Sequence, residues 1–529
     1  MREPEKKIPS LKSQSAWLLF AKFVGYFFAF ILPLIVVRVF TKEQVGSYRL
    51  IFQFIVNAVG ILPIGISMSV YYFLSRKKEN RSRTILNILL FNFVSGGIAF
   101  LVLFFYPQLL GNILQSEEMT RLAPKAGIVI WLWIFGMFLD VVAVANREPR
   151  IAAAFIVLSQ FTKTLFMTCA VLIFVTVDGV LYAAMLQASL QIVILLWYLN
   201  SRFRKFWKSF DFGFFRKQLK YALPFGFAGI LWIFQTDIHN YFVFYNFGEE
   251  KYAIYAYGCF EFPLISMLYE SISSVLIPKM SELQERDETQ KIIETTIAAM
   301  NKVALTFLPI FAFLMILSTP LFITLFTKEY VEGVSIFRIN LLLLPVYILL
   351  LDPMARAYEE VGRFLLKFRI LLIIGIISAL WFGLEHFDLR GMIGIVVVSI
   401  VIDRIVILMK LRKILDLKME HLFLLNTIGK TFLATFCSAA ILFLFYWFSK
   451  DSLYPNCIDV SKDILSYAGI ERLANLFGGS LYLGICLVIF SPVYYFFANS
   501  FGVIAESEKD LIWGFGAKIS RIFGKKTIQ

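Results

Sequence analysis

Apolar residues run through this chain in long blocks, and short polar or basic segments separate the blocks. A block of roughly 20 mostly apolar residues is long enough to cross the hydrocarbon core of a bilayer as one helix. The pattern therefore predicts an all-α integral membrane fold with about fourteen transmembrane helices. These helices are predicted near 16–38, 49–74, 84–106, 125–146, 151–175, 179–199, 221–245, 252–276, 295–325, 336–353, 366–385, 391–410, 422–448 and 478–499.

Lysine and arginine orient the predicted helices, because the cytoplasmic loops of membrane proteins carry an excess of both residues. With the N-terminus inside, the cytoplasmic segments hold about 33 basic residues and the opposite loops about eight. Both termini are then predicted in the cytoplasm, and we expect a multi-pass protein of the bacterial cytoplasmic (inner) membrane. The longest outer connection, 451–475, is too short for an extramembrane catalytic domain, so we do not expect an enzyme.

Composition agrees with a membrane protein. Of the 529 residues, 59% are hydrophobic and only 17% are charged, against about a quarter in soluble domains. The net charge of +14 could suit a nucleic-acid binder, but its place in the predicted cytoplasmic segments makes it a topology signal, and no nucleic-acid partner is expected. Five scattered cysteines show no metal-binding spacing, so we expect no metal site and no cofactor.

Two outer connections resemble each other. The segments VFTKEQVGSY (39–48) and NFGEEKYAIY (246–255) each follow an apolar block and open another. Each comes after the first helix of a predicted six-helix set, which predicts two parallel lobes related by an axis along the membrane normal. At a constant offset of 207 residues, the identities pair Phe40, Glu43 and Tyr48 with Phe247, Glu250 and Tyr255.

The predicted parts are an N-lobe at 1–200, a cytoplasmic linker at 201–220, a C-lobe at 221–412, and two further helices with a cytoplasmic tail at 413–529. The linker interleaves arginine and lysine with seven aromatic residues. That composition favours a segment lying on the inner leaflet, with rings in the acyl boundary and cations on anionic lipid. The alternative is an ordinary basic loop.

Several segments resemble one known family. They are RVFTKEQVGSY (38–48), FRKQLKYALPFGFAGI (215–230), QTDIHNYFVFYNFGEEKYAIYAYG (235–258) and LFTKEYVEG (325–333). In these segments and in its layout the chain resembles the polysaccharide-exporter (Wzx-like) flippases, of the superfamily that also holds lipid II flippases and multidrug and toxin extruders. The resemblance implies two six-helix lobes facing each other in a V, plus two C-terminal helices.

Basic residues inside the predicted spans are candidates for binding an anionic substrate, because charge at this depth is costly without a polar cavity or a partner. Lys22 lies about five residues into the first span, roughly 8 Å deep. Lys163 lies near the middle of the fifth span, and Lys302 lies in the ninth. We predict that these lysines line one central cavity, where ammonium groups would bind a diphosphate. Arg38, at the outer end of the first span, is a weaker candidate because it could be an interfacial anchor.

Asp237, His239 and Asn240 lie in the seventh predicted span, and Asp237 and Asn240 share a helix face. We predict that this group binds the coupling ion, Na⁺ or H⁺, or pairs with a cavity lysine. His239 could instead be a hydrogen-bonded histidine of the bundle. Structural pairing is expected for Asp140, Asp352, Asp403 and Arg404, while Glu261 and Glu270 are predicted to lie on opposite faces of the eighth span.

The function predicted from these features and the resemblance is transport by alternating access. The expected substrate is an undecaprenyl-diphosphate-linked oligosaccharide, moved from the inner to the outer leaflet. Its expected partners are that lipid-linked oligosaccharide, membrane lipid and proteins of glycan polymerisation or assembly. No GxxxxGK[ST] motif is present, which leaves an ion gradient as the energy source. The alternatives are a drug or cation antiporter of the same superfamily and a membrane glycan polymerase or glycosyltransferase.

Overall fold

The structure is a computed structural model that describes residues 11–76, 81–203, 206–208, 210–416, 425–466, 473–504 and 506. Every regular element among these residues is a helix, which confirms the predicted all-α class. The chain divides into two compact units. Unit 1 holds residues 1–267 and 366–399, and unit 2 holds 268–365 and 400–529. The predicted lobe boundaries stay predictions.

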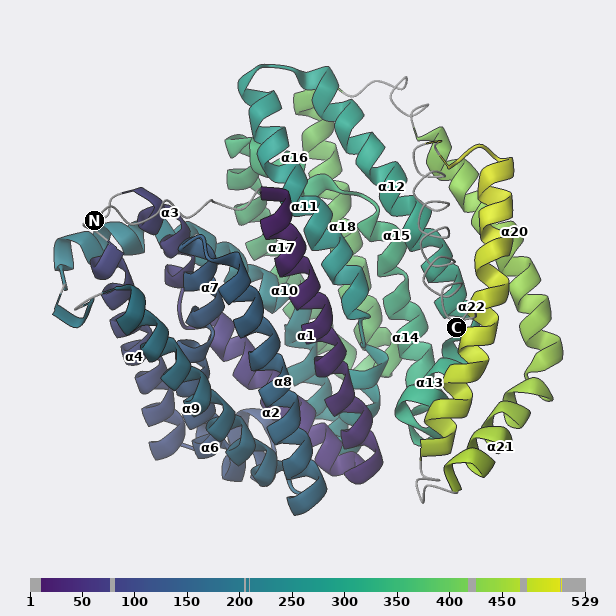
Figure 1. The fold of residues 1–529 in the computed structure, drawn as a ribbon, viewed down its shortest axis with the longest axis horizontal. Coiled ribbons are helices and arrows are strands. Elements are labelled where there is room, and N and C mark those ends of the chain that lie inside the picture. The colour runs from purple at the N-terminus through teal and green to yellow at the C-terminus, as the bar shows by residue number, and fades with distance from the viewer. Residues whose placement is uncertain are drawn as a thin grey trace, which may run out of the picture. The chain divides into compact units, whose positions relative to one another are not determined.

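Unit 1 contains the helices from the N-terminal part of the chain (Figure 1). They are α1 (Leu11–Val39), α2 (Lys42–Ile61), η1 (Ile66–Met68), α3 (Ser69–Arg76), α4 (Arg81–Phe105), α5 (Gln108–Leu114), α6 (Glu117–Gly136), α7 (Phe138–Ala145), α8 (Pro149–Phe174), α9 (Val177–Arg202), η3 (Phe206–Lys208) and α10 (Phe212–Gly258). Helix α1 packs on α8, α4 on α6, and α2 on α10. A buried core that includes Val70, Ile88, Phe138 and Leu195 joins α3, α4, α7 and α9.

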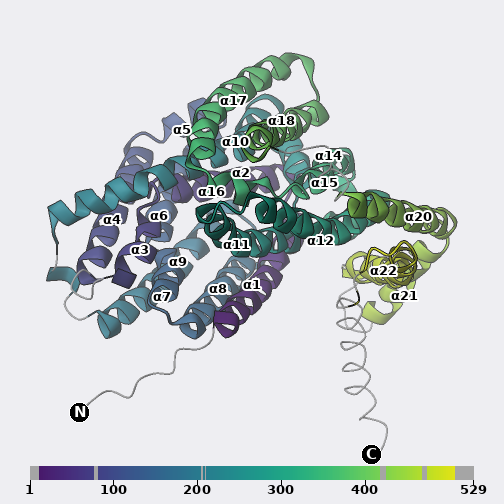
Figure 2. The same ribbon diagram turned by 90° about the horizontal axis from the view of Figure 1, so that it is seen from above.

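Unit 2 is also helical (Figure 2). Its elements are α12 (Thr289–Ile316), α13 (Ser318–Phe326), η4 (Lys328–Tyr330), α14 (Gly333–Leu341), α15 (Leu343–Tyr347), α16 (Leu351–Ala357), α20 (Asn426–Ser449), α21 (Leu453–Ser466) and α22 (Ala474–Ser500), with parts of α11 (Pro263–Glu285), α17 (Glu359–His386) and α18 (Leu389–Leu415). Helix α20 packs on α12 and α22, and α21 packs on α22. The outer connection predicted at 451–475 therefore contains a helix, α21.

Ten of the described helices are long and apolar enough to cross a membrane, or up to twelve if each of two bent pairs is one span. The predicted count of fourteen is therefore not confirmed. The bent pairs are Lys42–Ile61 with Ile66–Leu74, at 52°, and Gly333–Tyr347 with Leu351–Ala357, at 51°. The span predicted at 252–276 is interrupted, since α10 ends at Gly258 and α11 begins at Pro263. Proline has no backbone N–H and disfavours helical backbone in the residue before it, which explains the break.

Helices α2 and α10 pack closely along their length, and we call this contact the α2–α10 seam. At one end, a Cβ on Gly46 would lie 2.0 Å from the backbone oxygen of Glu249. At the other end, a Cβ on Gly226 would lie 2.3 Å from the backbone oxygen of Ile64, in the turn after α2. Glycine at both ends therefore lets the two backbones touch. The seam positions the polar side chains that lie between these ends.

Candidate functional site

A cluster of polar side chains occupies the middle of the α2–α10 seam. The Nε2 atom of Gln53 donates to Oδ2 of Asp237 at 3.0 Å and to Oδ1 of Asn57, also at 3.0 Å. Asn57 in turn donates to the Tyr241 hydroxyl at 3.0 Å. Asp237 is half-buried and forms no ion pair with any described residue. The carboxylate is thus held by neutral amides inside a span, where a proton or a cation could bind it.

His239 and Asn240 point elsewhere. The Nδ1 atom of buried His239 lies 2.7 Å from the hydroxyl of buried Tyr255, and the two rings also meet edge to face. Asn240 donates to the backbone oxygen of Asp237 at 3.1 Å, and its Oδ1 lies 3.4 Å from the Tyr252 hydroxyl. Both side chains therefore make contacts inside the second half of α10. The structure brings neither of them to the Asp237 carboxylate.

Lys163 extends from α8 toward α6. Its ammonium nitrogen lies 4.2 Å from the centre of the Trp133 ring, a cation–π contact. No described acidic residue pairs with it. The neighbouring Thr164 donates to the backbone oxygen of Phe28 at 3.0 Å, which fixes this part of α8 against α1. An ammonium group inside a span with only an aromatic face for a partner is available to an anionic ligand.

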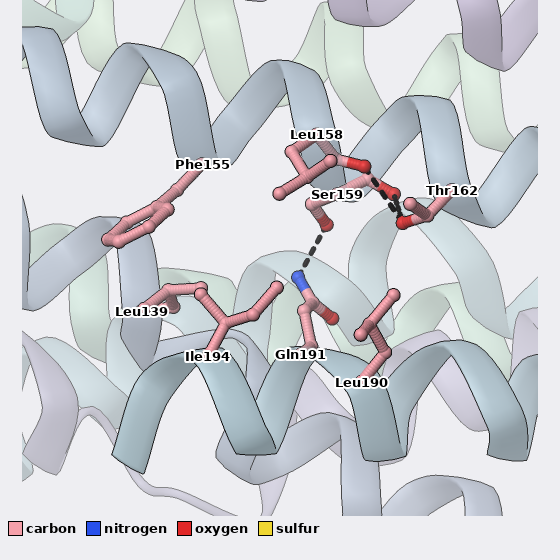
Figure 3. Close-up of a pocket in the computed structure, with 8 residues that line it drawn as sticks. All are labelled: Leu139, Phe155, Leu158, Ser159, Thr162, Leu190, Gln191 and Ile194. Atoms are coloured by element: carbon pink, nitrogen blue, oxygen red, sulfur yellow. Dashed lines mark hydrogen bonds between the residues drawn. The ribbon is translucent and has the colours of Figure 1, made fainter. Parts of the chain in front are cut away.

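A small cavity lies one residue from Lys163, between α7, α8 and α9 (Figure 3). Gln191 donates to the Ser159 hydroxyl across it, and Thr162 donates to the backbone oxygen of Leu158 at 2.8 Å. Its volume is about 10 Å³, which is room for about one water molecule. The cavity is too small for a sugar or a diphosphate, so it is not the substrate site. It is lined by Leu139, Phe155, Leu158, Ser159, Thr162, Leu190, Gln191 and Ile194.

Arg49 is a cation that the sequence analysis missed. Its Nη2 atom donates to the backbone oxygen of Ala256 at 3.3 Å, and its guanidinium lies 5.2 Å from the centre of the Tyr257 ring. It pairs with no described acidic residue. The missed signal is local: Thr41 and Gln44 form a capping box that starts the helix at Lys42, so Arg49 lies two turns inside α2 and not at its predicted beginning.

The other predicted cations have different surroundings. Lys22 is exposed on α1 and interacts electrostatically with Asp140 of α7. Arg38 donates to the backbone oxygen of Leu34 at 2.6 Å, one turn earlier in α1. Lys302 is exposed on α12, which belongs to unit 2. The shared cavity predicted for the three lysines stays a prediction.

The other charges in the spans also differ in their partners. Arg404 of α18, which is only 2% exposed, donates to Asp352 of α16 at 2.6 Å, and the Tyr269 hydroxyl donates to the same carboxylate oxygen at 2.8 Å. This ion pair confirms the structural pairing predicted for Arg404 and Asp352. Glu261, in contrast, is exposed and interacts electrostatically with Asp237. Among the described residues no group of three histidine, cysteine or acidic side chains could hold a metal ion.

Comparison with known proteins identifies the family of the chain and solved structures with a similar fold. A family described as "Polysaccharide biosynthesis protein" has a model that matches residues 51–335, more than half of the chain. No curated protein matches the chain. The lipid II flippase MurJ, in an inward closed conformation, has a TM-score of 0.63 at 15% identity, covering 95% of this chain and 100% of that chain.

Two more solved structures show the same fold. An inward-facing multidrug resistance MATE family transporter of the MOP superfamily has a TM-score of 0.60 at 16% identity, covering 76% of this chain and 94% of its own. A MOP superfamily transporter from Pyrococcus furiosus has a TM-score of 0.57 at 17% identity. The match covers 78% of this chain and 99% of that chain. These likenesses establish the fold, and the family match confirms the resemblance predicted from sequence.

Proposed function

Because the chain belongs to the polysaccharide biosynthesis protein family, we propose that it is a flippase for an undecaprenyl-diphosphate-linked oligosaccharide. The substrate would move from the inner to the outer leaflet of a bacterial cytoplasmic membrane. Alternating access, with the head group exposed first to one side and then to the other, suits a fold shared with MurJ and MATE transporters. Proteins that polymerise or assemble glycans are the expected partners.

One observation carries this proposal: unit 1 holds basic side chains inside its spans that have no acidic partner among the described residues. Lys163 contacts the Trp133 ring, and Arg49 contacts the Tyr257 ring and a backbone oxygen. A cation in a low-dielectric environment attracts an anion strongly. Arginine binds phosphate through paired N–H groups, and lysine binds it as a point charge. Each of these charges suits a phosphate of the diphosphate, and Lys22, Arg38 and Lys302 are the further phosphate-binding candidates that the sequence predicts.

Asp237 is the proposed coupling residue. It is held by Gln53 without a described basic partner, so a proton or Na⁺ could neutralise it in one state and leave in the other. His239 and Asn240 would support it through α10, since Asn240 bonds to the backbone of Asp237 itself. The electrostatic repulsion between Glu261 and Asp237 would favour binding of a cation there.

The proposal predicts that Lys163→Gln and Arg49→Gln each lower transport of the glycan lipid roughly 10- to 100-fold. A hydrogen bond to a charged group contributes about 1.5–3 kcal/mol, and glutamine keeps the polarity without the charge. Transport is measured by lipid analysis of cells that carry only the variant, where substrate should accumulate in the inner leaflet. The control is Lys291→Gln, whose exposed lysine pairs with Glu288 at the start of α12. Equal effects of all three changes would contradict the proposal.

The second candidate is a drug or cation antiporter. Asp237 and Glu261 favour it, because a cationic drug would pair with acidic side chains. The same cells distinguish the two functions. Unchanged glycan lipids together with altered drug sensitivity after deletion would support the antiporter.

A further inference from the structure

The aromatic rings of the linker and the start of α10 include a buried pair and an exposed group of three. Phe203 and Phe206 are 4% and 7% exposed and belong to the core of unit 1. Trp207, Phe210 and Phe212 are 53%, 53% and 69% exposed. The buried pair fixes the segment to the bundle, while the other three side chains are each more than half exposed. The interfacial role predicted for the whole linker can therefore apply only to part of it.

The described basic residues near the linker also form two groups, one with acidic partners and one without described acidic partners. Arg202 pairs with Glu148 at 3.1 Å, and Arg83 of α4 pairs at 3.2 Å with Asp211, the N-cap of α10. A second set is exposed and forms no ion pair with a described residue. Its members are Lys208, Arg216, Lys217 and Lys220. Four cations without a described acidic partner thus lie within 13 positions of three exposed rings, in the linker and the first turns of α10.

We propose that these seven side chains, which we call the linker surface, bind the anionic phospholipids of the cytoplasmic leaflet. Rings between the acyl chains and cations on the headgroups are the arrangement of an interfacial segment, and each cation near an anionic surface strengthens binding about fivefold. The linker surface consists of Trp207, Lys208, Phe210, Phe212, Arg216, Lys217 and Lys220.

Lipid bound there would hold the start of α10, the helix that carries Asp237. A buried contact reaches the same helix from the protein side, since Gln218 donates to the Ser69 hydroxyl at 2.9 Å and accepts from Asn87 at 3.3 Å. Asp211 caps the first turn by accepting from the backbone N–H of Phe214 at 2.9 Å. The inner end of α10 is thus fixed on one face by the protein and on the other by lipid. The membrane's anionic lipid content would then affect transport without touching the substrate site.

The test measures lipid retained by the purified full-length chain, by native mass spectrometry, over a titration with phosphatidylglycerol or phosphatidylcholine. The linker variant carries Lys208→Gln, Arg216→Gln, Lys217→Gln and Lys220→Gln. The matched control variant removes four exposed cations that each pair with a nearby acid: Lys279→Gln, Arg286→Gln, Lys291→Gln and Arg363→Gln. Both variants lose four positive charges. A difference in lipid binding between them therefore reflects where the charges lie and not the net charge of the protein.

The wild-type chain should bind phosphatidylglycerol more tightly than phosphatidylcholine, and the linker variant should bind it at least about tenfold more weakly than the control. Trp207→Ser should weaken both lipids. Equal losses in the two variants, or no preference for phosphatidylglycerol, would overturn the proposal. Displacement of the lipid by inorganic phosphate would also overturn it, in favour of a site for a soluble anion. If the fourfold variant does not fold, Lys217→Gln against Lys279→Gln makes the same comparison. Transport is not measured, so failure here leaves the flippase proposal standing.

Discussion

At the scale of single residues, the charged side chains of the predicted spans differ in their interaction partners. Arg404 faces the carboxylate of Asp352, while Asp237 accepts from the neutral amide of Gln53 and Lys163 faces a ring. A buried charge with a partner of opposite sign stabilises its surroundings only as part of that pair, and removing one member leaves the other uncompensated. A charge without such a partner is costly to hold inside a span and is available to a ligand. The two kinds should respond differently to substitution.

Arg404→Met should destabilise the protein by about 3–5 kcal/mol, because it removes the arginine from the Asp352 carboxylate. The double variant Arg404→Met with Asp352→Asn should recover much of that loss, since it removes both charges. Thermal unfolding in detergent measures both. Arg363→Gln, at an exposed cation paired with Glu359, should change stability by less than about 0.5 kcal/mol. A double variant less stable than Arg404→Met alone would show that the pair is not the source of the effect.

Asp237→Asn should leave the fold intact, because the new amide oxygen can still accept from Gln53. It should remove the dependence of transport on the ion gradient, since an amide cannot take up a proton and binds cations weakly. The measurement compares transport into proteoliposomes with and without an imposed Na⁺ or H⁺ gradient. Asn246→Ala serves as the control, because its side chain lies on the same helix but donates to the backbone oxygen of Leu384, away from the carboxylate. Gradient-driven transport by Asp237→Asn would assign coupling elsewhere.

At the scale of elements, the α2–α10 seam leaves no room for an added side-chain atom at either end. Close approach at Gly46 and at Gly226 brings backbone against backbone at both ends. The salt bridge from Lys42 to Glu250, at 3.1 Å, adds to the contact near Gly46. The seam also bears on the internal repeat, because Arg49 bonds to Ala256, the residue 207 positions later. Contacts between equivalent positions are expected next to a two-fold axis, and the repeat itself stays a prediction.

Gly46→Ala and Gly226→Ala should each destabilise the protein by about 1–3 kcal/mol, because a methyl group has no room against the opposite backbone. Gly229→Ala is the matched control. It changes the same helix one turn away, where nothing lies within 4 Å of an added Cβ, and should be neutral or slightly stabilising. Thermal unfolding in detergent tests all three. Equal behaviour of Gly226→Ala and Gly229→Ala would mean that the seam opens readily at that end.

At the scale of the whole molecule, much of the fold follows from where the apolar blocks lie. Such a block is stable in a bilayer only with its backbone hydrogen bonds closed within the segment, which dictates helix at almost every predicted span. The errors lie where local backbone chemistry interrupts a block. Pro263 divides the span predicted at 252–276, and the capping box at Thr41 starts α2 seven residues before the predicted position. The apolar content of a segment reveals neither the proline break nor the helix cap.

The sequence by itself determined the helical class, the family and the candidate charges, because each depends on residues close together in the chain. The roles of those charges depend on which helices meet. His239 and Asp237 are two residues apart, yet one bonds to Tyr255 and the other to Gln53 of a different helix. Only the tertiary structure decides this, because Gln53 lies 184 positions before Asp237 and such a separation leaves no local pattern. It also separates Arg404, which an acid neutralises, from Lys163 and Arg49, whose charges remain available to an anion.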